Sequence, residues 1–385
     1  MKPDLKLTSR MLRELGLTVP SVVVDEDRAR RNIRFMALRA ERAGARFRPH
    51  FKTHQSGAVG RWFADEGVSA ITVSSLAMAE YFAEFGWTDI TLAFLLNPLE
   101  LPRLGELARF LDSKGGQLGV TVDSPAAARA LGSARLPVTT WLKVDTGYGR
   151  TGLAWDQADT LRETRRALGD NQAVAGLLTH SGHSYQARTR QNLQAIWDTA
   201  LGRLRFARDL LGQDDLLLSV GDTPCCSTVE SLAGPDEVRP GNFVFYDLMQ
   251  LEIGSCAEEE LAAAAVCPVV GLYPERRQVV LHGGAVHLAK ERLDDSAGQA
   301  VFGKLGTLQD GGGGPPAFGP VLHQAPLVTL SQEHGVVSVP APRYEELVGG
   351  LEIGDLVLVY PVHACLTCDL HRQYHTLEGQ VLPRR

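Results

Sequence analysis

The sequence predicts an α/β protein in which an eight-stranded parallel β/α barrel precedes a second, mostly β domain. Three observations carry this prediction. Up to about residue 250, short β-branched or apolar runs alternate with longer segments of helical period. Beyond that point the strand-like runs are joined by Gly- and Pro-containing turns, and helical period is scarce. Polar and titratable residues follow several of the early runs, which is where barrel enzymes place their chemistry.

The first two thirds of the chain contain eight strand-like runs. Eight β/α units suit a closed barrel, and an open doubly wound sheet is the structural alternative. The runs cover residues 21–25, 46–52, 70–75, 89–94, 118–123, 139–145, 174–181 and 216–221.

Helices are predicted between these runs, because apolar residues recur there at three- and four-residue spacing. The clearest examples cover residues 26–44, 75–86, 124–133 and 193–212.

The second domain is predicted from strand-like runs at 269–284, 336–342 and 355–365. Residues 309–320, "QDGGGGPPAFGP", have the composition of a flexible surface loop. We therefore expect a barrel over residues 20–250 and a β domain over residues 251–385, which residues 1–19 join.

Composition restricts the class of partner. The 385 residues are 44% apolar and 22% charged, and the formal net charge is -6. A weakly acidic chain without runs of like charge gives no footprint for nucleic acid or for a membrane surface, so we expect a small-molecule partner. The N-terminus lacks the apolar core of a secretory signal, and the longest apolar run, residues 261–273, is too short to span a bilayer. These features predict a cytoplasmic protein.

Six cysteines in so long a chain do not make a disulfide framework. Only the pairs Cys225/Cys226 and Cys365/Cys368 are clustered, and in a reducing compartment such pairs are candidate ligands or nucleophiles.

The stretch "FRPHFKTHQ", residues 47–55, places Lys52 between His50 and His54 at the end of a strand-like run. A lysine held near apolar groups and other cations has a lowered pKa, so its neutral amine becomes a usable nucleophile. The alternative is a solvated surface lysine.

A second candidate site follows the last predicted barrel strand. Gly221, Asp222 and Thr223 offer backbone N–H groups and a hydroxyl that suit a phosphate, although the same residues also make an ordinary turn. A strand-end amine together with a phosphate cup is what pyridoxal phosphate requires.

Seven motifs, in order, resemble those of the metal-dependent D-serine dehydratase and D-threonine aldolase family. They are "PHFKTH", "DTGYGRTGL", "THSGHSY", "SVGDTP", "VRPGNFVFYD", "SQEHG" and "HACLTCDL". The resemblance runs from about Thr18 to the end of the chain. The family has the alanine-racemase-like fold of type III pyridoxal phosphate enzymes. This chain departs from the family pattern at Gln55, at Cys225 and Cys226, and at Cys368.

The resemblance implies a role for seven cofactor-binding residues. Lys52 would be the Schiff-base lysine. Arg150 would lie beside the cofactor ring or its 3-hydroxyl, and Tyr185 would approach the pyridine nitrogen. The phosphate would be bound by Gly221, Asp222 and Thr223, with Tyr246 nearby. A tyrosine at the ring nitrogen makes the ring a weaker electron sink than an aspartate would, so bond cleavage needs further assistance.

A metal is the candidate for that assistance. His363 and Cys365 are two residues apart, so on a strand their side chains would share a face. An imidazole and a thiolate favour Zn²⁺, and two protein ligands leave positions open for water and substrate. One alternative is a closed structural zinc site made of Cys365, Cys368, His371 and His375. The other is a set of unliganded core residues.

The resemblance, together with these residues, implies a lyase that eliminates water from a D-3-hydroxy amino acid, such as D-serine, D-threonine or D-threo-3-hydroxyaspartate. Lys52 would remove the α-proton, and the products would be a keto acid and ammonia. Retro-aldol cleavage to glycine and an aldehyde is the nearest alternative, since His-x-Cys resembles the dehydratases and His-x-Asp the aldolases. A non-catalytic pyridoxal phosphate carrier is the second alternative. We further expect a homodimer.

Overall fold

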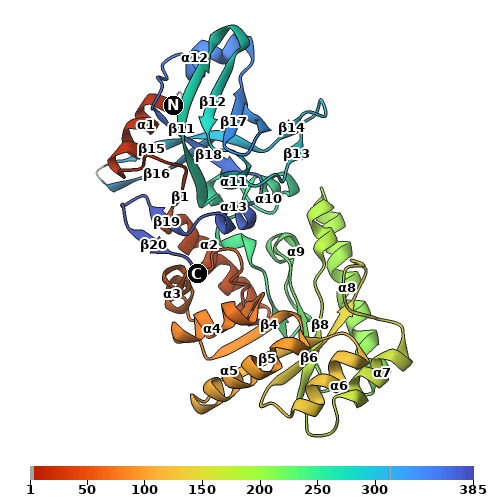
Figure 1. The fold of residues 1–385 in the computed structure, drawn as a ribbon. Helices are drawn as coiled ribbons and strands as arrows, with labels where there is room; N and C mark the ends of the chain where they lie inside the picture. Colours follow the sequence, from red (N-terminus) through yellow and green to blue (C-terminus); the bar gives the residue numbers. More distant parts are fainter. Residues whose placement is uncertain (1–3, 313) are drawn as a thin grey trace. The chain divides into compact units, whose positions relative to one another are not determined.

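The computed structural model describes residues 4–312 and 314–385. Its chain forms two compact units (Figure 1). The barrel unit comprises Ile33–Phe243 with Ile253–Ser255 and Arg385. The β unit comprises the residues up to Asn32 together with Val244–Glu252 and Cys256–Arg384. Among the described helices, none combines the length and the apolarity needed to cross a bilayer.

Eight parallel strands form a nearly closed barrel, as the sequence predicts. Their order is β2-β10-β9-β8-β6-β5-β4-β3, and hydrogen bonds from Phe51 N to Thr72 O and from Thr72 N to Pro49 O, both 2.9 Å, join the two ends. The short β7 (Leu153–Ala154) pairs with the end of β6. The barrel strands are β2 (Arg46–Phe47), β3 (Ala70–Val73), β4 (Asp89–Leu95), β5 (Gln117–Val122), β6 (Thr139–Asp145), β8 (Val174–Leu178), β9 (Leu217–Val220) and β10 (Glu237–Val238).

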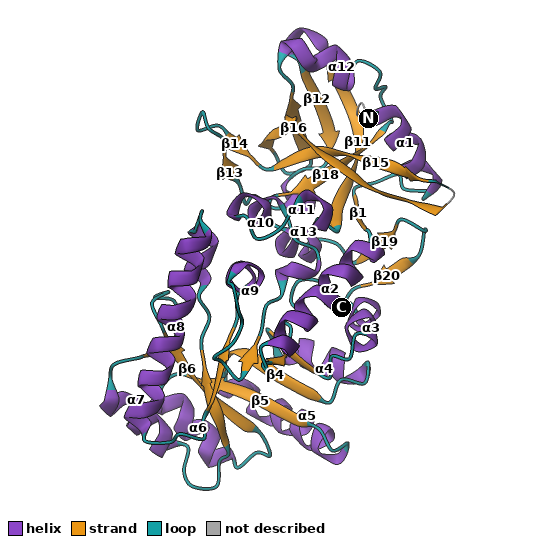
Figure 2. Ribbon diagram, turned by 180° about the vertical axis from the view of Figure 1, so that it is seen from behind, coloured by secondary structure: helices purple, strands orange, loops and turns teal. Residues whose placement is uncertain are grey.

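Helices cover the outside of these strands (Figure 2). Serine residues cap several of them. Ser75 Oγ accepts from Met78 N at 3.2 Å, and Gly212 ends α8 with φ 64°. The helices are α3 (Gly57–Asp65), α4 (Leu76–Glu84), α5 (Leu101–Ser113), α6 (Pro125–Ala134), α7 (Ala158–Ala167), α8 (Arg190–Leu211) and α9 (Thr223–Thr228), and α2 (Glu26–Arg42) contains the boundary between the units.

One predicted barrel strand was wrong. Residues 21–25 contain β1 (Ser21–Val24), which pairs with β11 and β19 in the sheet of the β unit. The eighth barrel strand is β10, which has only two residues and therefore no readable period. The strand that precedes Lys52 is consequently the first of the barrel, and "SVGDTP" follows the seventh.

The β unit is built on a nine-stranded sheet. Strands β12, β17, β16, β15, β18 and β11 follow one another, and β11 also pairs with β12, so these six close into a ring. The core inside includes Val279, Leu327 and Val357, all fully buried. The strands are β11 (Ala263–Tyr273), β12 (Gln278–His282), β15 (Gly303–Gly311), β16 (Gly314–Leu330), β17 (His334–Ser338), β18 (Leu356–Pro361), β19 (Gln373–Thr376) and β20 (Val381–Pro383), with β13 (Leu293–Asp294) and β14 (Ala300–Val301) pairing separately.

The sequence-based prediction of a surface loop over residues 309–320 was wrong. The described residues of this range lie largely in strands β15 and β16, where cross-strand hydrogen bonding overrides the glycine-rich composition.

The β unit also contains several short helices. The helices are α1 (Leu5–Glu14), α10 (Leu248–Ile253), α11 (Ala285–Leu288), α12 (Tyr344–Val348) and α13 (Ala364–Asp369).

Buried charged side chains join the barrel strands on the inside. The Arg48 guanidinium donates to the carboxylates of Glu237 and Asp89 and is only 2% exposed. Ser219 Oγ donates to Glu237 at 2.7 Å and accepts from Arg239 Nε at 2.6 Å. These bonds tie β4, β9 and β10 to the segment after β2.

We expect Arg48→Ala to lower the free energy of unfolding of the barrel by about 3–5 kcal/mol, because it leaves the Glu237 carboxylate buried without its cation. Arg46→Ala is the matched control, since Arg46 pairs with the same Asp89 from an exposed position and should cost less than about 1 kcal/mol. Urea titration followed by tryptophan fluorescence measures this unit, because all five tryptophans lie within residues 33–243. Equal losses in the two variants would contradict the prediction.

Candidate active site

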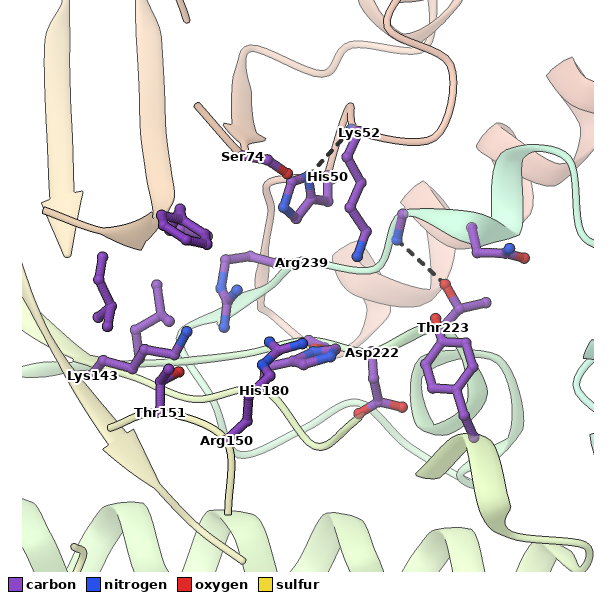
Figure 3. A pocket seen from close by; sticks show the side chains of 18 residues that line it. His50, Lys52, Ser74, Lys143, Arg150, Thr151, His180, Asp222, Thr223 and Arg239 are labelled. Atoms are coloured by element: carbon purple, nitrogen blue, oxygen red, sulfur yellow. Dashed lines mark hydrogen bonds between the residues drawn. The ribbon is translucent and has the colours of Figure 1, made fainter. Parts of the chain in front are cut away.

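A cavity of about 370 Å³ lies within the barrel unit, at the carboxyl ends of its strands (Figure 3). The side chains around it come from loops that are distant in sequence, as expected for a barrel enzyme. The titratable ones are His50, Lys52, Lys143, Arg150, His180, Tyr185, Asp222 and Arg239.

The cavity brings together six of the residues predicted to bind a cofactor. They are Lys52, Arg150, Tyr185, Gly221, Asp222 and Thr223. The seventh, Tyr246, belongs to the β unit, where it is buried with a φ of 47°, and it is not a lining residue of this cavity.

Glycines let the loops around the cavity approach closely. A Cβ on Gly221 would lie 2.8 Å from the carbonyl carbon of Arg239, and one on Gly241 would lie 2.7 Å from His50 O. The Thr223 hydroxyl accepts from Gly241 N at 3.3 Å, so its own hydrogen can point elsewhere (Figure 3). The main chains of the loops after β2, β9 and β10 are therefore in direct contact.

The Asp222 carboxylate already accepts hydrogen bonds from α9 and from the turn at Gly182–Gln186. Its Oδ1 accepts from Cys225 N at 2.8 Å and from Ser184 Oγ at 2.9 Å. An anion at this loop would therefore meet the Gly221 backbone and the Thr223 hydroxyl rather than the Asp222 side chain.

Two half-buried histidines line the cavity as neutral bases. Burial, together with the positive charge of Lys52, lowers the pKa of His180 to about 3 and holds the pKa of His50 well below its usual value. His180 Nδ1 lies 2.7 Å from Gly221 O, so a neutral ring carries its proton there and presents the Nε2 lone pair. His50 Nδ1 accepts from Lys52 N at 3.3 Å (Figure 3).

Positive charge dominates the lining. Lys52, Lys143, Arg150 and Arg239 contribute four cationic groups against the single carboxylate of Asp222. Burial and the neighbouring Arg150 lower the pKa of Lys143 to about 8, and burial lowers the pKa of Arg239 to about 10. Such a site is electrostatically incomplete without an anion.

Sequence reasoning missed three of these groups. Lys143, His180 and Arg239 line the cavity, and each lies at the end of a strand inside or beside a quoted motif, so position along the barrel was the available signal. His50 and His54 have different surroundings in the structure, because His50 lines the cavity and His54 does not. His54 is buried against Phe51 and Phe63, at ring-centroid distances of 4.5 and 5.5 Å, and has a packing role.

The predicted metal pair lies in the β unit, but not on a strand. Strand β18 ends at Pro361, His363 is the N-cap of α13, and Cys365 lies in that helix. The argument from strand alternation was therefore wrong. The two side chains nevertheless meet, because the Cys365 side chain hydrogen-bonds the His363 imidazole.

Acidic side chains surround this pair. Burial would lower the pKa of His363, but Cys365 and the Glu291 carboxylate raise it to about 11. Glu291 contacts Nδ1 of His363 and so leaves Nε2 for another partner. Asp247 fixes the helix itself, since its Oδ2 accepts from Ala364 N at 2.8 Å.

The four-ligand alternative has no support in the described part of the chain. Its members do not form a cluster of metal-ligand geometry there. Cys368 is buried against Tyr374, and His371 Nε2 lies 2.9 Å from the carbonyl oxygen of His287.

Comparisons with known proteins place the chain in a family. The family model described as "Alanine racemase, N-terminal domain" matches residues 24–248, and the one described as "Putative serine dehydratase domain" matches residues 262–377. A relative from Delftia sp. (strain HT23), D-threo-3-hydroxyaspartate dehydratase, is 32% identical over 92% of each chain. D-serine dehydratase of Dictyostelium discoideum is 26% identical over 94% of each chain. The chain belongs to the D-serine dehydratase-like family of fold type III pyridoxal phosphate enzymes.

A solved structure that is similar to this chain supports the same family, and it is described as a metal-free form. It is a cysteine-to-alanine mutant of D-threo-3-hydroxyaspartate dehydratase in the metal-free form, with a TM-score of 0.85 and 31% identity over 96% of this chain and 98% of that one. The predicted family, the barrel fold and the assignment to pyridoxal phosphate-dependent lyases are thus confirmed.

The residues present fit the family's cofactor and its metal. The cavity offers an amine, a glycine-lined loop with a hydroxyl and an excess of positive charge, which suit an aldehyde and a phosphate dianion. The imidazole of His363, oriented by Glu291, and the thiol of Cys365 suit a divalent metal of borderline softness.

We expect Gly221→Ala to weaken pyridoxal phosphate binding about tenfold or more, or ~1.4 kcal/mol, because the added Cβ collides with the Arg239 backbone, which cannot yield. Gly202→Ala is the matched control, since nothing lies within 4 Å of that position in α8. Equilibrium titration of the cofactor-free protein by absorbance gives both affinities. Unchanged affinity in Gly221→Ala would show that this turn does not bind the phosphate.

Proposed function

We propose that this chain eliminates water from a D-3-hydroxy amino acid, such as D-serine, D-threonine or D-threo-3-hydroxyaspartate, and releases a keto acid and ammonia. The observation that carries the proposal is the single cavity that holds Lys52, the Gly221–Thr223 loop and a cationic lining. We assign cofactor binding to the barrel unit and the metal ligands to the β unit. The elimination releases one water molecule, and hydrolysis of the released enamine to the keto acid and ammonia consumes one, so no net water is formed.

In this proposal Lys52 has two tasks. Its amine would hold pyridoxal phosphate, and the same amine, when free, would take the α-proton of the substrate. Pyridoxal phosphate, when bound, would supply the electron sink for the bond cleavage. The Gly221 backbone and the Thr223 hydroxyl would hold its phosphate, and Arg150 and Tyr185 would hold its ring. His50 and His180 stay neutral and do not compete with Lys52 for the proton.

The metal would lower the barrier to loss of hydroxide, which is a poor leaving group. We assign its ligands as Nε2 of His363 and Sγ of Cys365, with Glu291 orienting the imidazole through Nδ1. This donor pair favours Zn²⁺.

We further propose that the enzyme is a cytoplasmic homodimer with a free small-molecule substrate. None of the six cysteines, all of which lie in the described residues, forms a disulfide, and four of them are buried, as suits a reducing compartment. Burial raises the pKa of Cys225 and Cys226, so these two are inert packing groups rather than nucleophiles.

Reduction of the holoenzyme with borohydride should attach pyridoxyl to the peptide that contains Lys52. Lys143 is the matched rival, because it lines the same cavity and has a pKa lowered to about 8. Mass spectrometry of the digest should detect the pyridoxyl label on the Lys52 peptide of the Lys143→Ala variant and no label in the Lys52→Ala variant. Label on Lys143 in the wild-type protein would overturn the assignment.

Cys365→Ala should reduce keto acid formation by at least about tenfold while the bound cofactor keeps its visible absorbance, because the metal acts on the leaving group alone. Glu291→Gln should weaken activity or metal affinity ~10–100-fold through the orientation of His363. Cys368→Ala is the control and should keep both metal and activity.

Product analysis of Cys365→Asp addresses the aldolase alternative. A shift from keto acid toward glycine and an aldehyde would show that the second metal ligand selects between elimination and retro-aldol cleavage. Glycine and aldehyde from the wild-type protein would replace the proposed reaction with the aldolase one.

A further inference from the structure

Three candidate metal ligands gather in the β unit around the end of β12. They are His282, His287 and Glu333, and their ligand atoms all lie within 4.8 Å of one another. Glu333 Oε2 is 3.7 Å from Nε2 of His282 and 3.8 Å from Nε2 of His287. The two imidazole rings are nearly perpendicular, at 89°, with centroids 5.2 Å apart.

The backbone holds these side chains in place before any ligand arrives. The segment around α11 and the turn before β17 are joined by hydrogen bonds from Gly283 N to Glu333 O, 2.9 Å, and from Ala285 N to Ser331 O, 2.8 Å. A Cβ on Gly284 would lie 2.3 Å from Gln332 O, so the two segments touch main chain to main chain. Such rigid support is what a metal site requires of its scaffold.

A second layer of contacts fixes His287. His371 Nε2 lies 2.9 Å from the carbonyl oxygen of His287, and Thr367 Oγ1 donates to Leu288 O at 3.0 Å. These contacts connect α11 to α13, the helix that carries Cys365.

We propose that His282, His287 and Glu333 form a second divalent-metal site, distinct from His363 and Cys365. Two imidazole nitrogens and one carboxylate oxygen are a common Zn²⁺ donor set, and water completes the coordination because the cluster is partly exposed. Donor atoms around tetrahedral Zn²⁺ lie about 3.3 Å apart. The two distances from Glu333 need to shorten by about half an ångström, and the two imidazole nitrogens, which lie within 4.8 Å of each other, by at most about 1.5 Å. The bound ion would fasten α11 to the turn before β17 and so support α13.

Cobalt binding to the full-length, cofactor-loaded protein tests this proposal, because a thiolate ligand adds a charge-transfer band that nitrogen and oxygen ligands lack. In the Cys365→Ala background, one Co²⁺ per chain should still bind, without that band. Adding Glu333→Gln should weaken this remaining site at least about tenfold. Adding His334→Asn should not, since His334 is an exposed imidazole next to Glu333 that lies outside the cluster.

Zn²⁺ should also raise the melting temperature of Cys365→Ala, and the rise should be lost on adding His282→Asn or Glu333→Gln. Melting each protein first in chelator separates loss of metal from loss of folding. The proposal is overturned if Cys365→Ala takes up no Co²⁺, or if the added substitutions leave uptake and the Zn²⁺-dependent rise unchanged. In the first case the cluster is an ion-paired His–Glu group.

Discussion

The barrel depends on a buried chain of charges that runs from Asp89 through Arg48, Glu237 and Ser219 to Arg239. Each member satisfies the next, so a single truncation leaves a charge stranded in the interior. The chain also specifies pairing. Strand β10 has two residues and little apolar surface of its own, and the ion pair between its Glu237 and Arg48 supplies a reason for it to lie beside β2.

The last member of this series of bonded side chains, Arg239, lies at the candidate active-site cavity. Arg239 is fixed by Ser219 and by the carbonyl oxygen of Thr179, and it lines the cavity next to the Gly221 loop. The scaffold therefore delivers a positive charge to the position where the phosphate is proposed to bind. Because the histidines there are neutral, the positive charge that acts on an anion comes from the lysine and arginine side chains.

The sequence predicted the barrel correctly but reached eight strands by counting a wrong one. The run "SVVV" is as apolar as any barrel strand, and period cannot reveal that its partners are β11 and β19. Strand β10 could not be found, because two residues carry no period. Pairing partners are set by tertiary contacts that local pattern does not encode.

For the site, motif order located the lysine and the phosphate loop, since chemistry at strand ends is a property of the fold. Lys143, His180 and Arg239 were missed because a polar residue near the end of a strand is common and does not by itself indicate a functional role. Only the geometry distinguishes them: all three face one cavity in which four cations meet one engaged carboxylate.

His363 and Cys365 lie together although the local geometry predicted for them was wrong. His363 and Cys365 were paired through strand alternation, yet the chain turns into α13 after β18. Asp247 makes that turn possible by accepting from Ala364 N, which leaves the helix start fixed between His363 and Cys365. Glu291 then orients His363 from a segment that lies just beyond α11. The residue that orients His363 and the proposed His282–His287–Glu333 site thus both belong to the same short stretch after β12, although their ligand sets share no residue.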